Sequence, residues 1–172
     1  LIFNQKLPFF GMESIPYDKS MGRVLAENIN CDRDLPPFDR VAMDGIAIDF
    51  NSYKNGLRSF LIEDIQKAGD PSKKLIDNEK CLEVMTGAVL PSFTDTVIKF
   101  EDLTITDNIA VINEKVEVKK NQNIHFKGSD KLKGDLIIRI GQKVGTPEIG
   151  IISSVGKAYV KVQKSPSIAI VS

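Results

Sequence analysis

The sequence predicts a fold of the mixed α and β class, mostly β, in which a small β-barrel-like domain is inserted into an outer α/β domain. Three observations predict it. Short β-type segments follow one another closely between Ile46 and Val118. Two breaks bracket that region, a pair of prolines at 36–37 that forces an extended path and a polar run at 121–123. Beyond the second break, a clear helix start at Thr146 lies between two further strand-like runs.

The first part of the outer domain is expected to contain one helical turn and one strand. Pro16 suits the first turn of a helix, so we expect a short helical turn through residues 18–21 that ends at Gly22. The next run, residues 23–29, is expected to be a strand. The residues before Pro16 show no clear period and predict no element.

The inserted region is predicted to be nearly all β. Its candidate strands are residues 46–48, 59–65, 80–85, 96–100, 102–106 and 109–118. Between the last two lies Asp107-Asn108, a dipeptide that tolerates the left-handed conformation and is typical of a hairpin turn. Many short strands separated by glycine, proline and asparagine favour a small barrel or a sandwich.

The second part of the outer domain is expected to run strand, helix, strand. Residues 135–140 form the first strand, which Gly141 closes. The helix is expected to start at 146–148, where Thr, Pro and Glu offer an N-cap oxygen, a first-turn proline and an acid for the positive end of the helix dipole. Gly156 is expected to end the helix, and residues 159–162 form the second strand.

The last residues indicate a further domain. Residues 168–171, Ile-Ala-Ile-Val, form a continuous apolar run that is typical of a parallel strand buried on both faces. Because a parallel strand needs a crossover and a neighbour, we expect the chain to end in the first strand of a missing α/β domain. The predicted organisation is an outer domain of residues 16–38 plus 124–164, an inserted β-rich domain of residues 39–123, and the start of a truncated domain at 165–172.

Composition and charge exclude several classes of function. The 172 residues are 42% hydrophobic and 27% charged, which is normal for a soluble globular protein with a real core. Lysine plus arginine balance aspartate plus glutamate at 23 each, so no nucleic acid partner is expected. No apolar run approaches the roughly 20 residues that cross a bilayer, so no membrane partner is expected either. Two isolated cysteines and the lack of a visible signal peptide predict a cytoplasmic, reducing compartment.

The residues present also exclude several kinds of catalytic site. His125 is the one histidine, so a Ser-His-Asp or Cys-His site would have to use it, and no motif surrounds it. Two separated cysteines and one histidine make no recognisable zinc ligand set, and neither glycine-rich phosphate motif occurs. Oxygen chemistry remains. Five aspartates near the Pro-Pro break can bind a hard cation such as Mg²⁺ or can simply face solvent: Asp32, Asp34, Asp39, Asp44 and Asp49.

Two short segments are candidates for a binding site. In residues 42–45, Ala-Met-Asp-Gly, small residues surround an acid, and Gly45 permits a ligand to approach the backbone closely. In residues 85–91, Thr86 is expected to project from a strand end, where loops often carry function. Each segment is also compatible with an ordinary turn, so neither alone assigns a function.

Several blocks of residues, in order along the chain, carry a family resemblance: Gly22-Arg23-Val24-Leu25-Ala26-Glu27, Pro37-Phe38-Asp39, Ala42-Met43-Asp44-Gly45, Ala68-Gly69-Asp70-Pro71, Met85-Thr86-Gly87-Ala88 with Pro91, Asn123-Ile124 with Gly128 and Asp130, Gly134-Asp135, Thr146-Pro147-Glu148-Ile149-Gly150 through Val155-Gly156, and residues 166–172. Together they resemble the family of MoeA and the gephyrin E domain, the molybdopterin molybdenumtransferases. An ordered series of spaced blocks is far more specific than any one of them.

The resemblance implies a fold and a reaction. It implies a β-rich domain inserted into a domain that helps to form an elongated homodimer, followed by a pterin-binding domain. The implied reaction joins molybdate to adenylylated molybdopterin and releases AMP, with Mg²⁺ as the divalent cation. In that family the active cleft lies between the inserted domain of one subunit and the pterin-binding domain of the other, so this chain by itself is expected to be inactive.

The resemblance also implies residue roles. Asp44 matches the functional aspartate of the family's Ala-Met-Asp-Gly block and Thr86 matches the threonine of its Met-Thr-Gly block, so both are expected to be catalytic. Asp44 can hold Mg²⁺ or polarise a water beside the phosphoanhydride, and Thr86 can donate to an anionic oxygen of molybdate or nucleotide. Asp39, Gly45 and Gly87 are the expected cofactor-binding residues.

The sequence departs from the family pattern in two places. His125-Phe126-Lys127 stands where an arginine-rich run is usual, with Ser129 in place of an acid. After Pro91, Ser92-Phe93 replaces the usual glycine. The first departure argues against an anion-binding role for residues 125–130.

Two alternatives to an enzyme stay open. One is a dimeric protein-binding scaffold of the gephyrin type without catalysis, and the other is a structural oligomerisation module. Retention of Asp44 and Thr86 favours the enzyme, because a scaffold has no need of them.

Overall fold

The structure is a computed structural model that describes residues 10–167 and 169–171. The chain forms two compact units, a central unit of Asp34–Lys131 and an outer unit made of the residues on both sides of it. The central unit includes residues 34–38 and 124–131, which the sequence assigned to the outer domain. Paired backbone groups join these two segments, as in the mutual hydrogen bonds of Leu35 and Lys131. The functional division into domains stays a prediction.

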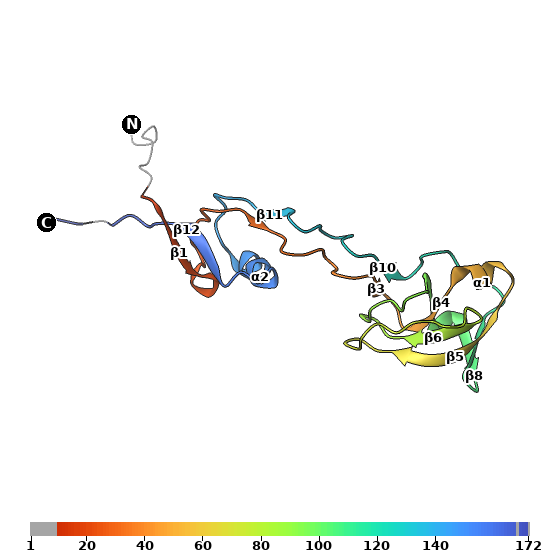
Figure 1. Cartoon of the computed structure of the whole chain (residues 1–172). Helices are drawn as coiled ribbons and strands as arrows, with labels where there is room; N and C mark the ends of the chain where they lie inside the picture. Colours follow the sequence, from red (N-terminus) through yellow and green to blue (C-terminus); the bar gives the residue numbers. More distant parts are fainter. Residues whose placement is uncertain (1–9, 168, 172) are drawn as a thin grey trace. The chain divides into compact units, whose positions relative to one another are not determined.

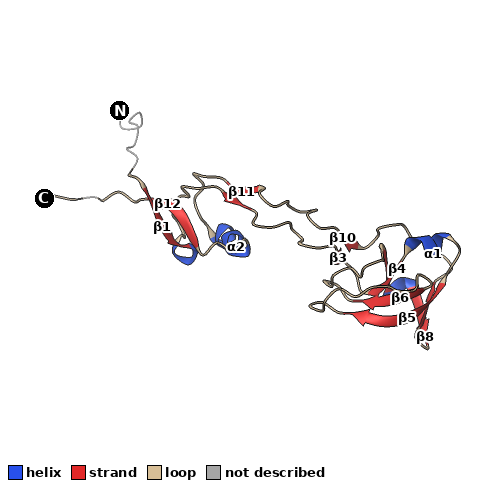
Figure 2. Ribbon diagram, in the orientation of Figure 1, coloured by secondary structure: helices blue, strands red, loops and turns tan. Residues whose placement is uncertain are grey.

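A single curled sheet of six strands forms the body of the central unit (Figures 1 and 2). In spatial order its strands are β7 (Thr96–Lys99), β4 (Gly45–Ile48), β6 (Lys80–Val84), β5 (Ser59–Gln66), β9 (Ile109–Ile112) and β8 (Leu103–Thr106). Only β5 and β6 are parallel, and the other described pairs are antiparallel. The helix α1 (Phe50–Lys54) follows β4, and the 3₁₀ turn η3 (Phe100–Asp102) follows β7.

Both faces of the sheet are covered at β4, which is buried along its whole length. On one side Ile46 and Ile48 pack with Phe60 and other apolar side chains in the larger core of the unit. On the other side Ala47 packs with Val84 and Val97 in a smaller core. This two-sided burial explains why β4 is a continuous apolar run, and it fixes the start of β4 in place.

The sequence predicted the strands of this sheet well, with one error of length. The turn at Asp107-Asn108 joins β8 to β9 with both residues at positive φ, 50° and 62°, which confirms the predicted hairpin. The strand predicted at 109–118 is wrong beyond Ile112. There Asn113 donates its backbone N–H to Asp102 and begins a turn, so the ladder ends.

Two short strands, β3 (Arg40–Val41) and β10 (Ile124–His125), pair where the chain enters and leaves the body of the central unit. Asp39 adds a hydrogen bond next to this pair of strands, because its Oδ1 accepts the backbone N–H of Lys127 at 2.8 Å. These contacts hold the residues before β4 in a defined path.

In the outer unit, β1 (Met12–Pro16) pairs with β12 (Tyr159–Gln163), and β2 (Ile29–Asn30) pairs with β11 (Leu136–Ile138). The helix α2 (Thr146–Ser154) packs its buried Ile152 into the core of the unit. The helical turn predicted after Pro16 is the 3₁₀ turn η2 (Tyr17–Lys19). The strand β1 was not predicted, since its apolar residues show little period.

The strand predicted at 23–29 is wrong except at its end. Leu25 donates its N–H to Gln142, whereas Ala26 donates to Lys161, so the segment changes partner from one residue to the next. Only isolated bridges form there, at Val24 and Leu25. No continuous ladder can develop until β2 begins at Ile29.

The helix α2 begins one residue earlier than predicted. The N-cap is Gly145 rather than Thr146, and the Glu148 carboxylate accepts the Gly145 N–H at 2.9 Å. This hydrogen bond makes the largest contribution to lowering the pKa of Glu148. Gly156, at φ 70°, follows the end of the helix as predicted.

The strand predicted at 168–171 stays a prediction, because the strand it is expected to pair with belongs to a further domain. Residues 169–171 belong to no strand, and Ile170 and Val171 are exposed, because no described segment pairs with them. Ile168 and Ser172 lie outside the described residues. In the described ranges no helix has the length and apolar character needed to cross a membrane. The prediction of a mixed α and β fold that is mostly β is confirmed.

We predict that Gly45→Ala destabilises the central unit strongly. The added β carbon would lie 1.9 Å from the carbonyl oxygen of Ile98, and a paired backbone cannot move aside cheaply. Overpacking of this kind lowers the free energy of unfolding by about 3 kcal/mol. Urea unfolding followed by circular dichroism measures the change.

Gly150→Ala is the matched control. Gly150 lies within α2 with open space where a β carbon would stand, so the replacement should raise the free energy of unfolding by about 0.5–1 kcal/mol. Similar effects of the two replacements would contradict the close contact at Gly45.

Candidate functional site

Asp44 and Thr86 lie in direct contact at one end of the curled sheet. Asp44 immediately precedes β4, and Thr86 follows β6 by two residues. Because β4 and β6 are antiparallel neighbours with Gly45 opposite Val84, the start of one strand meets the end of the other. Asp44 Oδ1 accepts the backbone N–H of Thr86 at 2.6 Å and its hydroxyl at 2.7 Å.

A tight turn aims both donors of Thr86 at this oxygen. The N–H of Ala88 donates to the carbonyl of Met85 at 3.0 Å, which closes a four-residue turn. Gly87 occupies the third position at φ 87°, the conformation of a type II turn that favours glycine. Gly87 therefore shapes the loop, and a contact between it and a ligand stays a prediction.

The contact keeps the carboxylate of Asp44 ionised. Hydrogen bonds from Thr86, first the backbone N–H and then the hydroxyl, lower the pKa of Asp44 below its ordinary value of 3.8. Both residues are exposed. Asp44 Oδ2 makes no hydrogen bond within the described part of the chain, so an ionised oxygen faces solvent beside Thr86.

The geometry gives the Thr86 hydroxyl a partner that the sequence did not predict. A hydroxyl has one proton, and in this structure that proton is donated to Asp44. The Thr86 oxygen can still accept a hydrogen bond, but it cannot at the same time donate to an oxyanion. In this structure the hydroxyl therefore orients Asp44, and donation to an anionic oxygen of molybdate or nucleotide stays a prediction.

Asp39 is tied to the same loop through backbone pairing. Its carbonyl accepts the N–H of Leu90, Val41 donates to Ala88, and Gly87 donates to Val41. The segment that leads to Asp44 therefore runs along the segment that follows Thr86. Asp39 Oδ1 is already occupied by the Lys127 N–H, and cofactor binding by Asp39 stays a prediction.

Gly45 is explained by packing. Its α carbon faces the backbone of β7, where a β carbon would overlap the Ile98 carbonyl. The sequence suggested that a ligand approaches the backbone at Gly45. In the structure, the group that lies close to Gly45 is the backbone of the neighbouring strand β7. Binding of a ligand at Gly45 stays a prediction.

The five aspartates near the Pro-Pro break do not gather into one site. Four of them have other contacts: Asp32 contacts Arg33, Asp34 pairs with the Lys127 side chain, Asp39 accepts from the Lys127 backbone, and Asp49 caps α1. Among the residues that the structure describes, no group of three or more His, Cys, Asp or Glu can hold a metal ion. Asp44 can therefore supply only one carboxylate to a cation, with other ligands coming from substrate or water.

The sequence did not predict the contacts of His125. Its Nδ1 lies 3.0 Å from Arg40 Nη2, and its Nε2 lies 2.9 Å from Asp130 Oδ1. Since a guanidinium can only donate, Nδ1 accepts, which places the proton on Nε2. The imidazole thus joins β3, through Arg40, to the loop that holds Asp130.

Comparisons with known proteins agree on one family. A family model described as the MoeA N-terminal region (domain I and II) matches residues 2–156. The chain is 43% identical over 166 residues to a molybdopterin molybdenumtransferase of Synechocystis sp., covering 96% of this chain and 42% of that relative. It is 32% identical over 164 residues to a molybdopterin molybdenumtransferase of Staphylococcus aureus, covering 92% of this chain and 38% of that relative.

A solved structure supports the same likeness. The crystal structure of a molybdopterin biosynthesis MoeA protein from Pyrococcus horikosii aligns with a TM-score of 0.80 and 30% identity, covering 91% of this chain and 40% of that one. The chain thus spans about two fifths of the length of the relatives that it matches.

We predict that Thr86→Val raises the pKa of Asp44 and leaves it below 3.8. The replacement removes the hydroxyl donor, whereas the backbone N–H of residue 86 still donates. Thr86→Ser keeps both donors and should leave the pKa unchanged. Carboxyl ¹³C shifts followed against pH measure both variants, and an unchanged pKa in Thr86→Val would contradict the hydroxyl contact.

The same contact sets a direction for acid stability. Because the pKa of Asp44 is lower in the folded chain than in the unfolded chain, the contact stabilises the fold above the ordinary pKa of 3.8. That stabilisation is lost as the pH falls through the lower, folded-state pKa. Acid unfolding should therefore begin at a slightly higher pH in Thr86→Val than in Thr86→Ser.

Proposed function

Because the chain belongs to the MoeA family, we propose that it forms part of a molybdopterin molybdenumtransferase. The proposed reaction inserts molybdate into adenylylated molybdopterin and releases AMP, as a step of molybdenum cofactor biosynthesis. The chain spans about two fifths of its relatives, so it is expected to be inactive by itself. The observation that carries the proposal is the exposed pair of Asp44 and Thr86, two residues from separate loops that meet at a strand end.

The charge state of Asp44 selects between its two expected roles. A general base works best when its pKa lies near the working pH. Hydrogen bonds from Thr86 push the pKa of Asp44 in the other direction, so this carboxylate is a weak base. An ionised oxygen that faces solvent is better suited to hold a cation than to take a proton from a water molecule.

Asp44 fits Mg²⁺ as a single ligand. A magnesium ion commonly takes one or two protein carboxylates and completes its shell with water and substrate phosphate oxygens. Asp44 Oδ2 would supply that carboxylate, while Thr86 holds the other oxygen and fixes the direction of the group. When bound, Mg²⁺ would neutralise charge on the phosphoanhydride.

We also propose that the protein acts as a homodimer in the cytoplasm. The family resemblance supports the dimer, and the two isolated, buried thiols of Cys31 and Cys81 support a reducing compartment. The gephyrin-type scaffold stays the alternative, in which the outer unit dimerises and no chemistry occurs.

We predict that Asp44→Asn lowers molybdate insertion by at least about a hundredfold, the typical cost of removing one preorganised polar group from a catalytic site. The asparagine side-chain oxygen can still accept both hydrogen bonds from Thr86, so the loop should keep its shape while the charge is lost. The assay uses the complete gene product with adenylylated molybdopterin, molybdate and Mg²⁺, and measures AMP and molybdenum cofactor.

Asp107→Asn is the matched control, because Asp107 is an exposed turn residue at positive φ, where asparagine is equally favourable. This variant should keep full activity. Retained activity in Asp44→Asn would refute the catalytic role of Asp44.

Sedimentation equilibrium tests the dimer. The 172-residue chain has a mass of 19.0 kDa, and the proposal expects a species of twice that mass at micromolar concentration. A single species of 19.0 kDa at all concentrations would show that this chain is not sufficient for dimer formation.

A further inference from the structure

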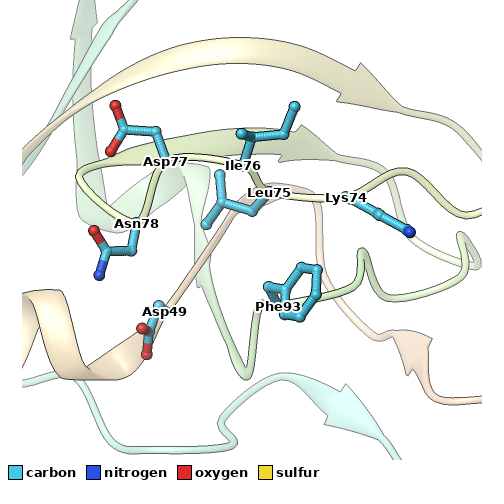
Figure 3. A pocket seen from close by; sticks show the side chains of 7 residues that line it. All are labelled: Asp49, Lys74, Leu75, Ile76, Asp77, Asn78 and Phe93. Carbon is cyan, nitrogen blue, oxygen red and sulfur yellow. The ribbon is translucent and has the colours of Figure 1, made fainter.

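A hollow of about 680 Å³ opens on the surface of the central unit, and neither Asp44 nor Thr86 lines it (Figure 3). Its walls are the loop of residues 74–78, the residue Phe93 from a second loop, and Asp49 at the start of α1. Backbone hydrogen bonds join the two loops, from Leu75 to Ser92 at 3.0 Å and from Ser92 to Lys73 at 2.9 Å. The hollow is thus formed in the chain as it stands.

Phe93 combines an unfavourable backbone conformation with high exposure, as expected of a side chain that a bound partner covers. Its backbone has a φ of 67°, which is unfavourable for a bulky side chain, and 74% of the residue is exposed. Within the central unit, burial of the ring therefore does little to offset the unfavourable backbone conformation of Phe93. The family resemblance favours a glycine near this position, so the aromatic side chain is a feature of this sequence.

One side of the hollow carries polar groups that can form further hydrogen bonds or ion pairs. Asp49 Oδ1 accepts the N–H of Asn51 at 2.9 Å, but Asp49 forms no ion pair within the described residues. The backbone carbonyl of Asn78 accepts the Ser52 hydroxyl, whereas the Asn78 amide has no hydrogen bond in the part of the chain that is described. Figure 3 shows both side chains on the same side of the hollow, with Leu75 beside them.

The neighbouring cation does not neutralise this side. Figure 3 shows the Lys74 side chain extending away from Asp49, with Phe93 between them. The second carboxylate of the hollow, Asp77, is 3.8 Å from Lys80 and points away from Asp49. The Asp49 side therefore presents a carboxylate, an amide and an apolar wall.

We propose that this hollow binds an arginine side chain of a partner protein. The guanidinium would donate to the Asp49 carboxylate, because its planar donors suit carboxylate oxygens, and its other donors would reach the side-chain oxygen of Asn78. The apolar stem would lie along Leu75 and Phe93, whose exposed ring also attracts a cation through its face. Ile76, 87% exposed at the rim, would contact the partner's neighbouring residues.

A small anionic ligand fits less well. The substrates of the proposed reaction are negatively charged, and the carboxylate of Asp49, which forms no ion pair within the described residues, would repel them. The hollow also opens to solvent, so a ligand needs a further surface to cover it, which a polypeptide supplies. This binding site is separate from the proposed chemistry, and neither depends on the other.

The test is a titration of the ¹⁵N-labelled chain with acetyl-Leu-Arg-Leu-amide and with the same peptide carrying citrulline, which lacks the charge. The arginine peptide should shift the Asn78 side-chain amide signals and the Phe93 backbone signal. The citrulline peptide should bind at least about tenfold more weakly, because a charge-assisted hydrogen bond is lost.

Three variants locate the binding. Asp49→Asn keeps the cap of α1 and should reduce the preference for arginine to about twofold or less, since asparagine caps a helix as well as aspartate does. Phe93→Ala should weaken both peptides, and Asp107→Asn should change neither. If Asp49→Asn fails to fold, Phe93→Ala still tests binding in the same hollow through an exposed side chain.

Equal affinity for the two peptides would overturn the proposal, as would the absence of shifts at Asn78 and Phe93. Preferential binding of AMP to these residues would also overturn it and would assign the hollow to a small anion. None of these outcomes changes the expected effect of Asp44→Asn on molybdate insertion, so the two proposals fail independently.

Discussion

The candidate site depends on two donors of one residue that converge on a single carboxylate oxygen. The backbone N–H and the hydroxyl of Thr86 reach Asp44 Oδ1 at 2.6 and 2.7 Å. This pair of hydrogen bonds fixes the direction of the carboxylate, lowers its pKa and leaves Oδ2 toward solvent. An ionised oxygen with a defined direction is what a cation or an ordered water requires, so the proposed chemistry follows from this one contact.

The rest of the central unit maintains that contact. The register of β4 and β6 brings Gly45 opposite Val84, which sets Asp44 and Thr86 at the same end of the sheet. Gly45 allows β7 to pair closely with β4, and Gly87 allows the turn that directs Thr86. Both glycines are thus explained by the geometry of the backbone, and the site would be disturbed if either gained a side chain.

The sequence predicted most of this sheet because its strands are short, rich in β-branched residues and separated by turn residues. It could not predict where a segment changes the strand to which its backbone is hydrogen-bonded. The run at 23–29 alternates between two partner segments, and the run after Ile112 turns at Asn113, and neither event leaves a local pattern. The sequence likewise indicated Asp44 and Thr86, but their contact depends on the pairing of strands that are more than thirty residues apart. The donation of the Thr86 hydroxyl proton to Asp44 likewise follows from the fold and has no local signal in the sequence.

A double-mutant cycle on the complete gene product tests the central claim most directly. Molybdate insertion is measured for Asp44→Asn, for Thr86→Val and for the variant with both changes. If Thr86 acts through Asp44, the double variant should be no less active than Asp44→Asn within about twofold, because residues that act as a unit are not additive. If the two losses multiply instead, Thr86 acts on the substrate independently, and the account of an oriented carboxylate would be contradicted.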